Sequence, residues 1–461
     1  MTVTAAQDHR DTHELRASAG AHLWRHFADM TTAADRPLNV MVRGEGCYLI
    51  DSEGNRYLDG LSNLFCVNLG YSYGEELGQA ALDQYRLLGY HSSWGSTHPT
   101  AIELATVLAD LAPANLNHVF LTPSGGESVE AAWKLAREYH SLRGEKRWKA
   151  IGRNLAYHGT TLGALSLNGL PELRSQFEPL VPGAAHVRNT KRLGRPASES
   201  EADFTGFLLD DLEERILAED PATIAMVIME PVQNHGGALM PPAGYFAGVR
   251  ALCDKYGILL VSDETITAFG RCGSWFASER FGMQPDIITT AKGLSSAYAV
   301  IGALIATEEV FSAFHQSGRK FTHGNTFGGH PVMAAVALRN IELMKELDLP
   351  GSVRNKESEL RNKLEALSAL PAVVDVRGTG FFYAIELATT EQDGERFSDE
   401  KMRRLYGDDR LTDQLAQHGV LLRLSMDGGD PVLCIAPPLV ADTDEIDHLV
   451  ETLHQVLTPL V

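Results

Sequence analysis

Two residues at the ends of separate apolar runs have side chains that could do chemistry together. Lys292 follows the β-branched run Ile287–Thr290, and Asp263 ends the run that begins at Ile258. A lysine that forms a Schiff base and an acid that keeps a pyridine nitrogen protonated are what pyridoxal phosphate (PLP) requires. An exposed loop charge is the alternative for a lone lysine, and the pairing with Asp263 favours the cofactor.

Other residues at predicted strand ends fit the same cofactor. Gly125 and Gly126 lie in a small-residue turn that opens a helix, where free backbone N–H groups attract a phosphate, although a plain helix cap uses the same residues. Tyr157 follows another strand, so its ring either stacks on a flat cofactor or packs in the core. Glu230 ends the run Ile224–Met229 and is either a functional acceptor or a helix cap.

An arginine inside an apolar run is a candidate for substrate recognition. Arg423 lies within residues 420–424, which otherwise read as a buried strand. A guanidinium is a planar, bidentate donor and suits a substrate carboxylate. Pairing with a neighbouring acid is the structural alternative, and spacing alone does not separate the two.

The elements that must position these residues alternate between helix and strand over residues 75–330. Short apolar runs at 119–121, 149–156, 224–229, 258–261, 287–290 and 302–306 are separated by helical stretches. Continuous apolar strands with helical connections predict an α/β fold, in which a mostly parallel sheet lies between helices. Ligands of such sheets bind beyond the carboxyl ends of the strands, where the candidate residues lie.

The sequence pattern near both ends of the chain predicts a smaller structural unit. We expect a helix around 23–33, a small antiparallel sheet over 40–58, and an acidic, polar stretch at 188–222 with a surface loop at 196–201. After a helix to residue 347, an α+β unit follows, with helices near 355–367, 411–417 and 443–457 and strands near 373–376 and 381–387. The predicted domains are 1–74 (N-terminal segment and part of the small domain), 75–330 (large domain) and 331–461 (small domain).

Composition narrows the class of protein. The chain has 461 residues, an apolar fraction of 44% and a net charge of −20, which argues against nucleic-acid partners and anionic membranes. The five cysteines lack CxxC spacing and metal-ligand spacing to a histidine, so we expect free thiols and no metal site. No signal peptide or membrane-spanning stretch is evident, which predicts a cytoplasmic protein.

Together these residues resemble the class III (ω-) aminotransferases, a family of fold-type I PLP enzymes, and within it the ω-amino acid:pyruvate and amine transaminases. The resemblance covers about residues 39–440. Six motifs stand in the family's order: Leu58-Asp59-Gly60, Ser124-Gly125-Gly126-Glu127, Tyr157-His158-Gly159, Glu230-Pro231-Val232, Asp263-Glu264 with Phe269-Gly270-Arg271, and Ala291-Lys292-Gly293 followed by His323-Gly324.

The resemblance implies the fold and the cofactor contacts. It implies a large domain with a mostly parallel seven-stranded sheet and a small α+β domain built from both termini. Lys292 would be the Schiff-base lysine and proton carrier, and Asp263 would pair with the pyridine nitrogen. The other cofactor-binding residues implied are Gly125, Gly126, Tyr157, His158, Glu230, Thr265 and Thr326, with Thr326 reaching the partner's phosphate across a dimer interface.

The resemblance also implies the activity and the substrate side. Phe65, Trp94 and Tyr157 would line the substrate pocket, and Arg423 would bind a carboxylate and swing away for a carboxylate-free amine. The implied reaction moves an amino group from an amine or ω-amino acid to a 2-oxo acid such as pyruvate, by a ping-pong mechanism in a homodimer or tetramer with shared sites. The alternatives are an aminomutase, a decarboxylating transaminase or a racemase on the same scaffold, or a non-catalytic regulatory protein.

Four departures from the family pattern bear on the site. Gly126 stands where the family usually has serine, so one hydroxyl to the phosphate is missing. Thr265 stands where valine usually packs on the cofactor ring, and Ala268 replaces a usual glycine. The segment 425–431 is longer than usual, which loosens the match of Arg423.

Overall fold

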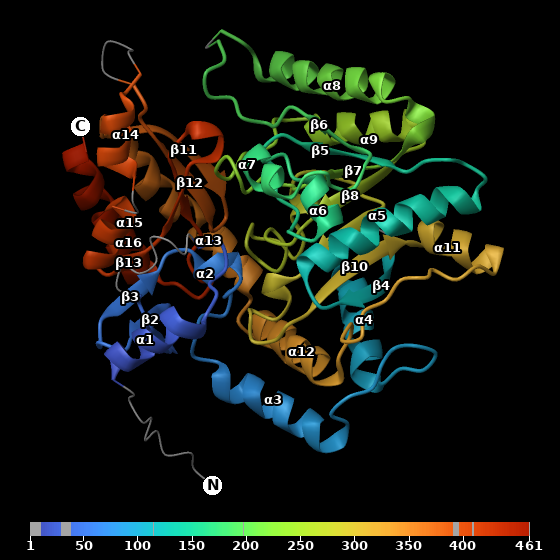
Figure 1. Cartoon of the computed structure of the whole chain (residues 1–461), viewed down its shortest axis with the longest axis horizontal. Helices are drawn as coiled ribbons and strands as arrows, with labels where there is room; N and C mark the ends of the chain where they lie inside the picture. Colours follow the sequence, from blue (N-terminus) through green and yellow to red (C-terminus); the bar gives the residue numbers. More distant parts are fainter. Residues whose placement is uncertain are drawn as a thin grey trace.

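A seven-stranded sheet forms the centre of the large domain (Figure 1). The computed structural model describes residues 11–28, 38–113, 115–196, 198–390, 396–407 and 410–460. Its strands lie in the order β4-β10-β9-β8-β7-β5-β6. β10 is antiparallel to both of its neighbours, and the other described pairs are parallel. The bounds are β4 Leu116–Thr122, β5 Lys149–Arg153, β6 Ala184–Val187, β7 Ile224–Met229, β8 Leu259–Asp263, β9 Ile287–Thr290 and β10 Gly302–Thr307.

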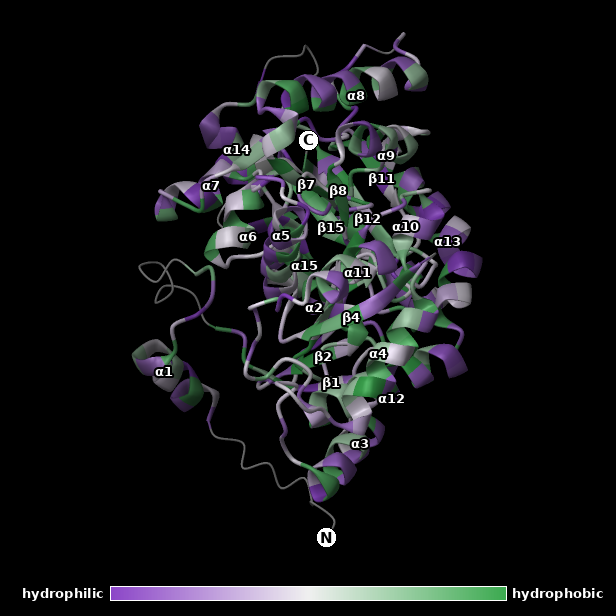
Figure 2. Ribbon diagram, turned by 90° about the vertical axis from the view of Figure 1, so that its right-hand side faces the viewer, coloured by the Kyte–Doolittle hydropathy of each residue, from purple (hydrophilic) through white to green (hydrophobic). Residues whose placement is uncertain are grey.

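Helices cover both faces of this sheet, which explains its continuous apolar strands. Every residue of β7 is buried. Met226 and Ile228 pack in one cluster with α5 (Gly125–Leu142) and α11 (Glu308–Ser317), whereas Val227 and Met229 pack with α8 (Glu201–Ala218) and α9 (Tyr245–Tyr256). Figure 2 shows the hydrophobic strands β7 and β8 in the interior and the largely hydrophilic helix α13 at the periphery. The predicted mostly parallel sheet between helices is confirmed.

Two four-stranded sheets belong to the smaller unit. One has the order β1-β2-β3-β13 and the other β11-β12-β15-β14. Their bounds are β1 Met41–Glu45, β2 Tyr48–Asp51, β3 Arg56–Asp59, β11 Val373–Thr379, β12 Phe382–Leu387, β13 Val420–Leu421, β14 Arg423–Ser425 and β15 Val432–Ile435. Since β13 joins three strands from the start of the chain, segments from both ends form one unit, as predicted.

The remaining longer helices connect or flank these sheets. They are α1 Thr12–His22, α3 Gly74–Leu87, α4 Pro99–Leu111, α12 Pro331–Glu346, α13 Leu349–Glu365, α14 Asp399–Tyr406, α15 Arg410–Gln417 and α16 Thr443–Leu457. α12 packs against α3 and α4. The domain limits 1–74, 75–330 and 331–461 stay a prediction. In the described part of the chain, no helix is long and apolar enough to cross a bilayer.

Several local predictions were wrong or incomplete. We expected a helix at residues 23–33, but residues 23–28 are not helical, and residues 29–33 lie outside the described residues. The helix α1 lies earlier in the chain, because the Asp11 side chain caps it by accepting a hydrogen bond from the His13 N–H. The acidic stretch 188–222 is not all loop. Within it Ser200 and Asp203 form a capping box that starts α8, a signal that was readable in the sequence.

The sequence prediction differs from the structure for one strand region of the smaller unit and for one strand of the large sheet. The run 420–424 is not one strand: Val420 and Leu421 pair with β3, whereas Arg423 pairs with Cys434 of β15, so the chain changes sheets at Leu422. β6 was not assigned to any apolar run, since Ala184–Val187 carries a single β-branched residue.

Candidate active site

A cavity of about 290 Å³ lies at the carboxyl ends of β8 and β9, beside the first turn of α5. It brings together residues that are far apart in the sequence. Its walls comprise Ser124, Gly125, Gly126, Tyr157, His158, Gly159, Thr160, Thr161, Glu230, Val232, Asp263, Thr265, Ile266, Thr267, Ala291 and Lys292. Eight of the predicted site residues are therefore neighbours, as expected at the strand ends of an α/β sheet.

Lys292 is held at the cavity wall in an uncommon backbone conformation. Its φ is 45°, in the left-handed region that non-glycine residues rarely adopt. Its Nζ lies 5.4 Å from the centre of the Phe65 ring. Loss of water around the ammonium group, together with the positive charge of Arg423, lowers the pKa of Lys292 to about 8. About a tenth of this lysine is therefore neutral, and nucleophilic, at pH 7.

Asp263 is a buried carboxylate held by several donors. Its Oδ2 lies 2.7 Å from Nδ1 of His158. Its Oδ1 accepts hydrogen bonds from the Thr265 N–H at 3.1 Å, the Thr265 hydroxyl at 2.6 Å and the Thr289 hydroxyl at 3.2 Å. Burial alone would raise the pKa of Asp263, but these bonds outweigh it and leave the pKa below its usual value. The group stays anionic.

Glycines and a helix N-terminus form another part of the cavity wall. Ser124 caps α5, its hydroxyl accepting a hydrogen bond from the Glu127 N–H. A Cβ on Gly125 would lie 2.8 Å from Cγ2 of Thr265, so only glycine fits there. Gly126 is different, because the nearest atoms to an added Cβ are at 3.8 Å. Open N–H groups at the start of an 18-residue helix suit a phosphate.

Glu230 and Tyr157 also line the cavity. The Glu230 carboxylate accepts hydrogen bonds from the Asn234 N–H at 3.0 Å and the Tyr157 N–H at 3.4 Å. Burial raises the pKa of Glu230, and the nearby negative charge of Asp263 adds to that rise. The Tyr157 ring lies 5.2 Å from the His235 ring, at an interplanar angle of 30°. Glu230 thus organises the loop 231–235 as well as facing the cavity.

Arg423 is close to Lys292 but only weakly bound. Its guanidinium carbon lies 5.1 Å from the centre of the Phe65 ring, the same ring that Lys292 approaches. Its contacts are long: 3.5 Å to Oδ1 of Asn234 and 3.6 Å to Sγ of Cys434. Its Nε is buried and has no hydrogen-bond partner among the described residues. Such a guanidinium can accept a carboxylate at little cost in existing contacts.

Four predicted site residues do not line this cavity in the single chain: Phe65, Trp94, Thr326 and Arg423. Phe65 and Arg423 lie beside Lys292, whereas Trp94 and Thr326 lie at the surface. Trp94 is 69% exposed and packs near Gly324. Thr326 is exposed, and its carbonyl accepts a hydrogen bond from the Tyr90 hydroxyl at 2.7 Å. The roles of Trp94 and Thr326 therefore stay predictions that depend on a second subunit.

Sequence reasoning missed three polar residues of the site. Thr161 lines the cavity beside Gly126, and its hydroxyl is buried without a hydrogen-bond partner. Thr289 donates to Asp263, and Asn234 approaches Arg423. Thr289 was readable as one of two threonines in the short strand β9; nothing local in the sequence distinguishes Thr161 or Asn234.

The residues present fit PLP. A lysine of lowered pKa, an anionic acid and a helix N-terminus with free N–H groups share one cavity. The buried Thr161 Oγ1 and His158 Nε2 have no described partner. Lys292 would hold the aldehyde carbon, Asp263 would face the ring nitrogen, and Gly125 and Gly126 would hold the phosphate.

Comparison with known proteins agrees with this geometry. The family description "Aminotransferase class-III" matches residues 30–457. A probable aminotransferase of Mycobacterium tuberculosis is 45% identical over 95% of this chain and 93% of its own length. A putrescine–pyruvate aminotransferase of Pseudomonas aeruginosa is 35% identical over 97% and 96%. The crystal structure of an (S)-enantioselective ω-transaminase from Thermomicrobium roseum has a TM-score of 0.92 and 36% identity, covering 98% of this chain and 99% of that one.

The Thr265 hydroxyl yields a prediction about stability. Thr265→Val removes the 2.6 Å bond to Asp263, so we expect the cofactor-free protein to lose about 1–2 kcal/mol of stability at pH 7. The pKa of Asp263 is lowered in the folded state, so this bond stabilises the fold at neutral pH and its effect fades as pH falls and the carboxyl protonates. Thr265→Ser keeps the hydroxyl and is the control. Because this fading begins only below the ordinary aspartate pKa of about 3.9, unfolding by urea at pH 7 and at about pH 3 measures both variants, and equal losses at these two pH values would contradict the assignment.

The space beside Gly126 yields a prediction about the cofactor. Gly126→Ser should fit, because an added Cβ meets only ordinary contacts, and its hydroxyl can donate to the phosphate. We expect PLP to bind about three- to tenfold more tightly, the value of one additional hydrogen bond. Titration of cofactor-free protein measures the Kd, with Gly126→Ala as the control that adds Cβ alone. Weaker binding by the serine variant than by the alanine variant would rule this out.

Proposed function

This chain belongs to the class III aminotransferases, a family of PLP enzymes, and from that premise we propose that its amino donor is an amine or ω-amino acid and its acceptor a 2-oxo acid. The protein is a PLP-dependent aminotransferase. One relative is named a putrescine–pyruvate aminotransferase, which supports pyruvate as the proposed acceptor and a diamine among the candidate donors.

The observation that carries this proposal is the pair of cations on the Phe65 ring. Lys292 Nζ and the Arg423 guanidinium lie 5.4 and 5.1 Å from its centre. Lys292 supports chemistry at the amino-bearing carbon of a substrate, and Arg423 supports binding of a carboxylate a short distance away. A 2-oxo acid presents both a carbon that exchanges its oxygen for an amino group and a carboxylate. A simple amine presents only the first.

Lys292 and Asp263 have different roles in the proposed reaction. When bound, PLP supplies a conjugated ring that delocalises the electron pair left by proton removal. Lys292 Nζ, with a pKa of about 8, takes the proton from the amino-bearing carbon and returns it. The anionic Asp263 carboxylate favours a protonated ring nitrogen. In the proposed ping-pong order, Lys292 would deliver the proton to the cofactor carbon instead of the donor carbon. Water would supply the oxygen of the carbonyl compound that leaves, and the amino group would stay with the cofactor. The 2-oxo acid would then receive that group by the reverse steps, and its oxygen would leave as water.

We also propose a homodimer with shared active sites. Tyr90, Trp94 and Phe327 are exposed aromatic side chains beside Thr326. Exposed aromatic clusters of this kind are typical of interfaces between subunits. A reducing, cytoplasmic compartment is proposed because none of the five cysteines forms a disulfide.

Lys292 gives a prediction with a pH dependence. Its lowered pKa means that the neutral amine rises tenfold per pH unit below about 8 and levels off above it. Covalent capture of PLP by cofactor-free protein, trapped with borohydride and mapped by peptide, should follow that curve. Lys292→Ala should keep the fold by circular dichroism and transaminate negligibly. Normal turnover in this variant, or a label on another lysine, would remove Lys292 from the mechanism.

Arg423 gives the prediction that tests the substrate class. Arg423→Ala should raise the KM for pyruvate about ten- to hundredfold, since charge-assisted hydrogen bonds to the carboxylate are lost. The half-reaction with 1-phenylethylamine, which has no carboxylate, should change less than about threefold. Arg423→Lys keeps the charge without the bidentate fork and should lie between. Equal losses for both substrates would place Arg423 outside the acid-binding site.

A further inference from the structure

The β-hairpin that carries Arg423 is anchored at its tip to the large domain. β14 and β15 are joined by residues 426–431, the segment that is longer than usual in this chain. An added Cβ on Gly428 would meet Leu155 at 3.7 Å. Asp430 Oδ2 lies 2.7 Å from Nζ of Lys191, which follows β6 of the large sheet. The hairpin tip therefore packs on residues that come from the other domain.

One buried carboxylate links this anchor to a second loop. Glu386 of β12 is 3% exposed. Its Oε1 accepts a hydrogen bond from Lys191 at 2.8 Å, and its Oε2 lies 2.8 Å from NH2 of Arg377 on β11. We call Lys191, Arg377, Glu386 and Asp430 the Glu386 network. Removing water from these charges is costly, so such a network fixes geometry more than it adds stability.

Arg377 connects the Glu386 network to the loop at residues 234–237. Its Nε donates to the Gly237 carbonyl at 2.6 Å, and its NH2 donates to the Gly236 carbonyl. Gly237 has a φ of +84°, and an added Cβ would lie 2.4 Å from Cγ1 of Val432, so the loop is pressed against β15. This loop also holds Asn234, whose Oδ1 is 3.5 Å from Arg423.

The two loops tied to Glu386 thus lie on either side of Arg423. The loop 234–237 offers Asn234 to its guanidinium, and the loop 426–431 follows its strand directly. The Arg423 backbone pairs with Cys434, but its side chain has only long contacts. The side chain's position is therefore set by the loops around it rather than by strong bonds of its own.

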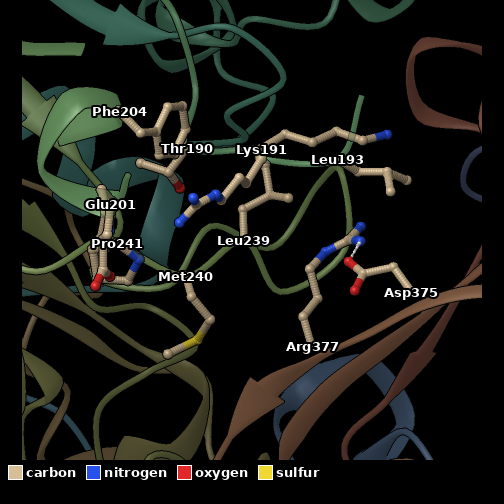
Figure 3. Close-up of a pocket in the computed structure, with 12 residues that line it drawn as sticks. Thr190, Lys191, Leu193, Glu201, Phe204, Leu239, Met240, Pro241, Asp375 and Arg377 are labelled. Atoms are coloured by element: carbon tan, nitrogen blue, oxygen red, sulfur yellow. Dashed lines mark hydrogen bonds and ion pairs between the residues drawn. The ribbon is translucent and has the colours of Figure 1, made fainter. Parts of the chain in front are cut away.

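A cavity lies next to the network, but Lys191 and Arg377 are not arranged to bind a ligand in it. Figure 3 shows it, about 390 Å³ in volume, with Lys191 and Arg377 among its lining residues. The Lys191 side chain runs away from the middle of the cavity, and the Arg377 guanidinium faces Asp375. Both cations are already engaged by carboxylates or carbonyls, so they hold protein segments together instead of awaiting a ligand.

We propose that Lys191 and Asp430, acting through the Glu386 network, are positioning residues that hold Arg423 where it meets a substrate carboxylate, and so set the preference for carboxylate-bearing over carboxylate-free substrates. This rests on the proposed function of Arg423. Lys191 and Asp430 touch neither substrate nor cofactor. Their effect should therefore appear in the KM for the acid, not in the chemistry at Lys292.

The test uses the PLP-loaded protein with Asp430→Asn and Lys191→Met. Asp430→Asn is the milder change, because Lys191 keeps its bond to the buried Glu386. Each should raise the KM for pyruvate about three- to tenfold, the size of coupling between residues of one network, and leave the 1-phenylethylamine half-reaction within about twofold. Lys191→Arg should restore the KM. Lys255→Met, which breaks an exposed pair with Glu213 between α8 and α9, is the matched control and should change neither.

A double-mutant cycle with Arg423→Ala separates this inference from the proposed function. If Lys191 acts through Arg423, Lys191→Met should add almost nothing to the KM for pyruvate once Arg423 is alanine. Additive effects, an unchanged KM in Asp430→Asn, or equal losses for acid and amine would overturn the inference. Should Arg423→Ala itself harm both substrates equally, the proposed role of Arg423 fails, and this inference fails with it.

Discussion

The site depends on keeping a negative charge at Asp263 inside the protein. A buried carboxylate is unfavourable unless donors compensate it, and here His158, Thr265 and Thr289 supply them from three different elements. The strand order places β8 beside β9, so Thr289 reaches Asp263 and Lys292 follows on the same edge. Since the acid remains anionic while the nearby lysine has a lowered pKa, one cavity holds both an electrostatic partner for a cofactor ring and a base near neutrality.

The substrate side is organised differently, by loops instead of strand ends. Phe65 and Arg423 come from segments near opposite ends of the chain, and they meet over Lys292 because β3 and β13 pair in one small sheet. Arg423 has few strong contacts, and the loops beside it are bound to Glu386. The cofactor-binding part of the site is thus held by strand ends, and the part that binds a carboxylate is held by loops. This division suits an enzyme whose two substrates react at the same kind of carbon but differ in their remaining groups.

Much of the large domain was readable because its strands are continuous apolar runs. The limits of β7 and β9 agree with the sequence prediction, since a strand buried on both faces lacks charged residues and is rich in apolar and β-branched ones along its whole length. The short, alanine-rich β6 carries little such signal and was not assigned. The sequence predicted a single strand over residues 420–424. A run of hydrophobic residues indicates that they are buried, but it does not indicate which sheet each residue joins. The change of sheets at Leu422 follows because Val420 and Leu421 pair with β3, which is distant in sequence, whereas Arg423 pairs with β15 in a local hairpin.

The sequence by itself determined the chemical types at the strand ends: a lysine, an acid, a glycine turn and an arginine, in the order of a known family. It could do so because residue types and the spacing of motifs are properties of the chain itself and do not depend on how it folds. Only the tertiary structure decided which polar groups surround them, such as the Thr265 hydroxyl on Asp263, the unpartnered Thr161, and the ties from Lys191 and Arg377 to Glu386. Hydrogen bonds and ion pairs act over about 3 Å, and residues separated by hundreds of positions come that close only when the sheets are assembled.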